Sequence, residues 1–79
     1  MIGKTVAVIG QGTAGLWFDF VLNRLGAARV IALDPKTYRL KLAQQYGASD
    51  TINIQDKDPI EEITKINGGS LADLSLIHI

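Results

Sequence analysis

The sequence has no cysteine and only one histidine, and these two shortages exclude several kinds of site. Without cysteine the chain has no disulfide scaffold, no thiolate metal ligand and no cysteine nucleophile. A single histidine does not supply the His ligands of a self-contained zinc site. We therefore expect no metal-binding residue in this chain.

The chain also lacks a charge excess and long apolar runs. Eight Lys and Arg residues balance eight Asp and Glu residues, so no basic surplus is available for nucleic-acid phosphates or an anionic membrane. The apolar runs are far shorter than the ~20 residues that span a bilayer, and the start does not resemble a signal peptide. We expect a soluble, cytoplasmic chain with neither nucleic-acid nor membrane partners.

What the sequence does contain is a regular alternation of apolar segments within 79 residues, enough for one small domain. Short continuous apolar runs predict strands that are covered on both faces. The predicted strands are Lys4–Ile9, Arg29–Leu33, Thr51–Asn53 and the run Ala72–Ile79.

The first of three predicted helices is Leu16–Leu25, and Gly26 is placed to end it. This segment is apolar on most sides, so we expect it to be largely buried. Trp17, Phe18 and Phe20 have no interleaved basic residues, which favours core packing over stacking on nucleic-acid bases.

The second predicted helix is Lys36–Tyr46, closed by Gly47. Its apolar side chains recur every four residues, which is typical of an amphipathic helix: Tyr38, Leu42 and Tyr46. The third begins after Asp58, with Pro59 in its first position, and ends at Gly68-Gly69. Its inward residues are expected to be Ile60 and Ile63, with Ile66 or Asn67.

The order β-α-β-α-β-α-β predicts an α/β fold with a parallel sheet and right-handed crossovers. Gly10-Gln11-Gly12-Thr13-Ala14-Gly15 lies between the first strand and the first helix. This is the setting of a dinucleotide-binding GxGxxG loop. Gly10 allows the tight turn, Gly12 the approach of a pyrophosphate, and Gly15 close packing of helix on strand.

An acidic residue is expected about 20 positions after such a loop, and Asp34 follows the second strand. Its carboxylate would accept hydrogen bonds from the ribose hydroxyls and repel a 2′-phosphate, which favours NAD over NADP. The alternative is that the glycines only form a turn and Asp34 caps the next helix.

Other ligands use related loops. An S-adenosylmethionine methyltransferase would carry an acidic residue ahead of the glycines, and Val6–Ile9 contains none. An FAD-binding N-terminus remains an alternative, because VAVIGQGTAGL would fit one. A non-catalytic nucleotide-binding or regulatory module is another.

The region after Asp34 distinguishes these alternatives. Tyr38–Asn53 resembles the second half-unit of medium-chain, zinc-containing alcohol dehydrogenases, including sorbitol- and threonine-dehydrogenase-like members. Asp58-Pro59-Ile60, Gly68-Gly69 and Ala72-Asp73-Leu74 resemble the family's next helix and strand entry. The resemblance extends from about Gly3 to Leu74.

The resemblance implies a partial Rossmann fold in residues 1–79, the N-terminal half of a three-layer, doubly wound αβα domain. It makes Gly10, Gly12 and Gly15 the pyrophosphate loop, Asp34 the ribose acceptor and Arg39 a donor beside the adenosine. Thr13-Ala14 departs from the commoner Pro-Ile or Gly-Val pair, so Ala14 provides less support for the nicotinamide ring.

The resemblance also implies a longer parent enzyme, with NAD as cofactor and an alcohol or carbonyl compound as substrate. The zinc, the catalytic residues and the second half of the domain would lie elsewhere in that parent, which we expect to be a homo-oligomer. We expect no catalytic residue in this chain, His78 included. Ser75–Ile79 depart from the family pattern and also resemble translated adapter sequence, so they support no functional assignment.

Overall fold

A computed structural model of the chain describes residues 4–68 and 74–78. Strands and helices alternate along it in the predicted order, which is thereby confirmed. The elements are β1 (Thr5–Ile9), α1 (Thr13–Arg24), β2 (Arg29–Asp34), α2 (Thr37–Gln45), β3 (Asp50–Asn53), α3 (Pro59–Ile66) and β4 (Leu74–His78).

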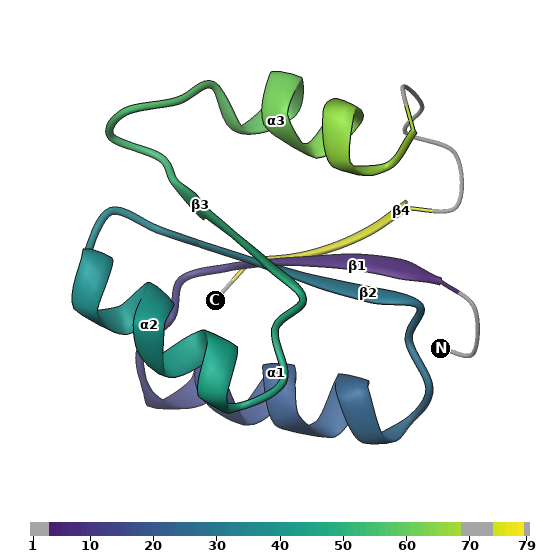
Figure 1. The fold of residues 1–79 in the computed structure, drawn as a ribbon. Helices are drawn as coiled ribbons and strands as arrows, with labels where there is room; N and C mark the ends of the chain where they lie inside the picture. Colours follow the sequence, from purple (N-terminus) through teal and green to yellow (C-terminus); the bar gives the residue numbers. More distant parts are fainter. Residues whose placement is uncertain (1–3, 69–73, 79) are drawn as a thin grey trace.

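The four strands form one parallel sheet in the order β3-β2-β1-β4. This order matches four consecutive positions of the 3-2-1-4-5-6 arrangement of doubly wound domains. Helices α1 and α2 cover one face of the sheet, and α3 covers the other (Figure 1). The α/β class, the parallel sheet and the three layers predicted from the sequence are therefore confirmed.

Alternate residues of the central strands build two separate cores, as the two-residue period of a strand requires. Val6, Val8 and Val30 pack with Leu22 of α1 on one face. The other face contributes a cluster beneath α3, made of Ala7, Ile31, Leu33, Ile52 and Ile63. The continuous apolarity of β1 and β2 thus reflects burial on both faces.

Helix α1 is less buried than predicted. Only Gly15, Asp19 and Leu22 are buried, while Trp17 is 61% exposed. The other exposed apolar residues of this segment are Phe18, Phe20 and Leu25. The prediction was wrong because a single sheet face covers one side of the helix, whereas these apolar side chains extend around most of its circumference.

The inward face of α2 also differs from the prediction. Its buried residues are Leu40 and Ala43, which pack against Ala32 and Ala48. The four-residue stripe chosen from the sequence is exposed: Tyr38, Leu42 and Tyr46. The three alanines bring the helix close to the sheet and leave no room there for tyrosine rings.

Helix α3 begins as predicted. The Asp58 carboxylate accepts hydrogen bonds from the main-chain N–H groups of Ile60 (2.9 Å) and Glu61 (3.2 Å), and Pro59 is the first helical residue. Ile63 is buried, but Ile60 is exposed, contrary to the prediction.

Candidate functional site

The glycine-rich loop lies at the carboxyl end of β1 and leads directly into α1. Gly10 has a φ of 96°, a conformation that favours glycine. Its N–H donates a 2.8 Å hydrogen bond to the Leu33 carbonyl oxygen of β2. The chain therefore turns sharply beside the end of β2, as the loop motif requires.

The other two glycines have different surroundings. A Cβ at Gly15 would overlap the carbonyl oxygen of Gly10, so only glycine allows α1 to pack this closely on the loop. A Cβ at Gly12 would meet no protein atom within 4 Å, and Gly12 has an ordinary extended backbone. The protein itself therefore does not require glycine at position 12, and the space beside it is open to a ligand.

The N-terminus of α1 is suited to an anion. Its N-cap residue, Gly12, has no side chain to satisfy the first N–H groups, and its first turn contains no acidic residue. The helix α3 differs, because Asp58 caps it and Glu61 and Glu62 lie in its first turn. The exposed first residues of α1, Thr13 and Ala14, thus present N–H groups at the positive end of a helix dipole.

Asp34 ends β2 directly beside this loop and is only 1% exposed. Its Oδ2 accepts a 2.7 Å hydrogen bond from the Gln11 N–H, and its Oδ1 accepts a 2.8 Å bond from the Lys36 N–H. The carboxylate does not cap α2, because Lys36 occupies the N-cap position without a side-chain cap bond. It instead shapes the turn before the helix and holds the glycine-rich loop.

Arg39, predicted from the sequence as a donor beside the adenosine, lies next to Asp34. Its Nη1 is 3.5 Å from Oδ2 of Asp34, and its guanidinium lies 5.8 Å from the centre of the Tyr38 ring. The side chain is 38% exposed. Tyr38, and more weakly Asp34, raise the pKa of Arg39, so it remains a cation beside the buried carboxylate.

Two residues without a predicted role are buried at this end of the fold: Gln11 in the loop itself and Asp19 in α1. Asp19 of α1 is 0% exposed, and no described residue makes a hydrogen bond to either of its carboxyl oxygens. Burial raises the pKa of Asp19 to about 7, and the neighbouring Gln11 side chain offsets part of the rise. The signal in the sequence was an acid between two phenylalanines in the apolar middle of the helix.

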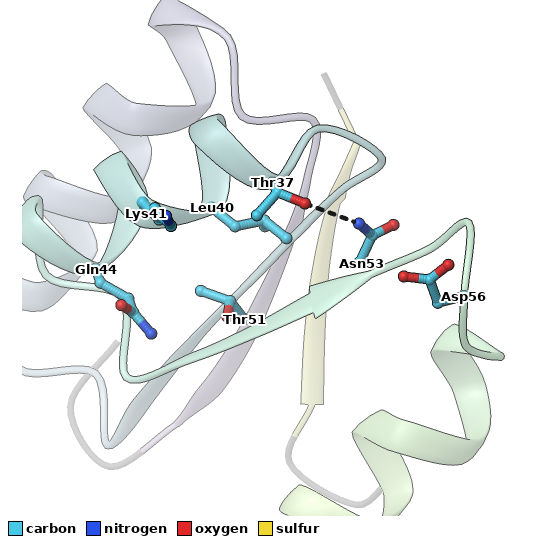
Figure 2. Close-up of a pocket in the computed structure, with 7 residues that line it drawn as sticks. All are labelled: Thr37, Leu40, Lys41, Gln44, Thr51, Asn53 and Asp56. Carbon is cyan, nitrogen blue, oxygen red and sulfur yellow. Dashed lines mark hydrogen bonds between the residues drawn. The ribbon is translucent and has the colours of Figure 1, made fainter.

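A separate hollow of about 430 Å³ lies between α2 and β3 (Figure 2). Its lining is mostly polar: Thr37, Leu40, Lys41, Gln44, Thr51, Asn53 and Asp56. The Asn53 amide nitrogen lies 3.4 Å from the Thr37 hydroxyl across it. Neither the glycine-rich loop nor Asp34 lines this hollow, so it is distinct from the candidate site.

Residues 4–68 and 74–78 contain no group of three or more His, Cys, Asp or Glu side chains placed to hold a metal ion. His78 is exposed at the end of β4. Within the same described ranges, no helix has the length and apolarity needed to cross a membrane.

The sequence model of the zinc-binding dehydrogenase family matches residues 15–79. An L-threonine 3-dehydrogenase of Bacillus subtilis (strain 168) is 44% identical over 72 residues, which are 91% of this chain and 21% of that protein. An alcohol dehydrogenase structure from Thermotoga maritima has a TM-score of 0.86 at 35% identity, over 98% of this chain and 22% of its own.

A putative zinc-binding dehydrogenase from Sinorhizobium meliloti 1021, solved bound to NADP, has a TM-score of 0.74 at 32% identity. The match covers 76% of this chain and 18% of that structure. The chain thus spans about a fifth of the length of the L-threonine 3-dehydrogenase it matches. A family match over most of the chain favours the dehydrogenase interpretation over the flavoprotein alternative. The chain belongs to the zinc-binding dehydrogenase family.

Proposed function

We propose that this chain is the dinucleotide-binding segment of a zinc-dependent dehydrogenase that transfers hydride between NAD and an alcohol/carbonyl pair. The proposal rests on one arrangement: an uncapped helix N-terminus, an open space at Gly12 and a buried carboxylate meet at the ends of β1 and β2. Ligands of doubly wound sheets bind at this edge.

The residues present fit the parts of a dinucleotide. The pyrophosphate would lie beside Gly12, where the N–H groups of Thr13 and Ala14 provide donors at the positive end of α1. Gly10 would provide the turn and Gly15 the close packing of α1 that complete this pyrophosphate loop. The adenosine ribose would lie at Asp34.

In this proposal Arg39 covers Asp34 before the ribose binds and lies beside the adenosine afterwards. Its 3.5 Å separation from Asp34 is longer than a good hydrogen bond, and the side chain is partly exposed. Movement of the guanidinium outward would uncover Oδ2, which has a remaining lone pair for a ribose hydroxyl. The displaced Arg39 would then lie beside the adenosine.

The choice of NAD over NADP rests on the charge at Asp34. A 2′-phosphate would approach a carboxylate already held in place by two main-chain N–H groups. The negative charges of the phosphate and the carboxylate would repel each other. Lys36, Arg39 and Lys41 provide positive charge nearby, and a relative is bound to NADP, so NADP is the competing cofactor to be measured.

In the proposed enzyme this chain would bind and orient the dinucleotide, and the dinucleotide would supply the hydride chemistry. The zinc, the substrate pocket and the second half of the Rossmann domain would belong to other parts of a homo-oligomeric parent. Residues 1–79 would thus be a partial dinucleotide-binding domain without catalytic residues.

The test is a titration of the full-length protein that contains this segment with NAD and NADP, followed by NAD reduction with alcohols and polyols. We expect saturable NAD binding, weaker NADP binding and turnover that a zinc chelator abolishes. Binding without any turnover would instead favour a regulatory nucleotide-binding module. Absence of binding would refute the proposal.

A further inference from the structure

Gln11 and Asp19 are neighbouring polar residues, both 0% exposed, that the proposed binding of a dinucleotide does not use. Three of their side-chain oxygens have no hydrogen-bond partner among the described residues: Oε1 of Gln11 and both carboxyl oxygens of Asp19. Such orphaned buried atoms are rare in folded proteins, because each has lost its hydrogen bonds to water without gaining a partner.

The number of available hydrogen-bond donors explains why all three oxygens lack a partner. An ionised Asp19 and the Gln11 carbonyl oxygen are both acceptors, so they cannot pair with each other. Nε2 of Gln11 already donates one hydrogen, over 3.1 Å, to the Val8 carbonyl oxygen, and it has a second hydrogen to donate. One proton on Asp19 would complete a reciprocal acid–amide pair, with O–H to Oε1 and Nε2–H to the other carboxyl oxygen.

The same glutamine is connected to the candidate site through its main chain. Its N–H donates the 2.7 Å hydrogen bond to Oδ2 of Asp34, and it precedes Gly12. A fixed Gln11 side chain therefore fixes both the start of the loop and the orientation of the Asp34 carboxylate.

We propose that Asp19, as a neutral acid paired with the Gln11 carboxamide, is a positioning residue for the glycine-rich loop. The role rests on the proposed dinucleotide binding, to which the loop contributes the pyrophosphate and ribose contacts. Loss of the proton removes the O–H donor, so only the Nε2–H bond can remain and Oε1 of Gln11 is left beside a negatively charged carboxylate, which loosens the loop.

Asp19 gains and loses its proton near neutral pH, because burial raises its pKa to about 7. The elements packed against α1 are β1, β2 and α2, and β4 pairs with β1. Besides Asp19, α1 has one ionisable side chain, Arg24. The ionisable side chains of the neighbouring elements are Arg29, Asp34, Tyr38, Arg39, Lys41 and His78. Asp34 and Arg39 pair with each other, and the shift at Asp19 comes from burial and Gln11.

The protonation can be tested without cofactor, by infrared difference spectra of the full-length wild type against Asp19→Asn. We expect a protonated carboxyl band at pH 6 that is lost as the pH rises through 7. Absence of this band at pH 6 would overturn the proposal.

The positioning role is tested by NAD titration at pH 6 and pH 8. If only the neutral pair holds the loop, wild-type affinity falls about tenfold at pH 8, in proportion to the neutral fraction. Asp19→Asn retains both hydrogen bonds and does not titrate, so it should bind like the wild type at pH 6 and lose nothing at pH 8. Asp19→Leu, or Gln11→Leu if that variant does not fold, should bind weakly at both.

The exposed acid Asp56 supplies the control, and Asp56→Asn should keep the wild-type pH dependence. Equal wild-type affinity at both pH values, with the infrared band present, would refute the positioning role alone. Failure of the wild type to bind NAD at either pH would refute the proposed function, and the positioning role with it.

Discussion

The main-chain N–H of Gln11 donates a 2.7 Å hydrogen bond to Oδ2 of Asp34, joining the glycine-rich loop to the end of β2 across 23 residues of sequence. The same carboxylate also accepts from the Lys36 N–H. Asp34 is therefore a structural acceptor for the loop as well as the proposed ribose acceptor, and its replacement has two separable effects.

The first prediction concerns cofactor choice. In the full-length protein we expect NAD to bind at least about tenfold more tightly than NADP, a difference of ~1.4 kcal/mol. Asp34→Ser should narrow this ratio because it removes the charge that repels a 2′-phosphate. Both affinities should also fall, since the Gln11 N–H loses its acceptor, so the ratio measured by titration of both cofactors is the informative quantity.

Asp50, at the start of β3, provides a matched control, because its carboxylate forms a 3.7 Å ion pair with Arg29 and has no part in the proposed site. Asp50→Ser should leave the NAD/NADP ratio unchanged. Equal affinity of the wild type for both cofactors would contradict the role assigned to Asp34.

The second prediction compares two glycines of one loop. Gly12→Val should abolish most NAD binding by the full-length protein while leaving its far-UV circular dichroism intact, because a Cβ at this position meets no protein atom within 4 Å. Gly15→Ala should destabilise the fold itself, because its Cβ overlaps the Gly10 carbonyl oxygen. A folded Gly12→Val protein with unchanged NAD affinity would show that the loop is only a turn.

The strand and helix order was predictable because each segment carries a local signal. Gly26 ends α1, the Asp58 side chain caps α3, and the continuous apolarity of β1 and β2 indicates burial on both faces. The inward faces of α1 and α2 were not predictable by hydrophobicity alone. Contact with a sheet depends on which side chains are small enough to allow close approach, as at Ala43, and larger apolar residues such as Trp17 remain outside.

The turn at Gly10 and the close packing at Gly15 were predictable because the motif specifies both. The binding roles of this loop, Asp34 and Arg39 remain predictions. The burial of Asp34 was not evident from the sequence. Its carboxylate is stabilised by main-chain N–H groups, which do not depend on the side chains of the donating residues. The burial of Gln11 and Asp19 was also missed, since amide and carboxyl side chains are usually exposed.

The third prediction concerns stability and pH. Folding raises the pKa of Asp19 from 3.8 to about 7, so the folded state holds a proton that the unfolded chain releases between these values. Stability contributed by this group therefore falls as the pH rises from about 4 to 7, by up to ~1.4 kcal/mol per pH unit, and stays low above 7. The Asp19→Asn variant has no proton to release here, so its stability should not fall in this way as the pH rises.

Thermal unfolding of the full-length protein and of Asp19→Asn at pH 5 and pH 8 provides the measurement. The Tm advantage of the variant should be larger at pH 8 than at pH 5. A constant difference between the two proteins across this range would show that Asp19 has an ordinary pKa.

The last prediction concerns the 79-residue chain by itself. A chain of this size has a small core, and without a disulfide or a metal its burial barely offsets the entropy of ordering. Here β4 has an open edge at one end of the parallel sheet, and α1 exposes Trp17, Phe20 and Leu25. Open strand edges and apolar patches both promote association.

We therefore expect the isolated 79-mer to be marginally folded or self-associating in sedimentation experiments, with a weak thermal transition. Trp17→Ser combined with Leu25→Ser should reduce its association, because these side chains make the exposed face of α1 apolar. Alcohol-dependent NAD reduction should be absent with or without added zinc, since the chain is proposed to have no catalytic residue. A cooperative monomer melting above about 65 °C, the upper end for ordinary mesophilic domains, would contradict the stability argument. Zinc-dependent turnover would contradict the functional one.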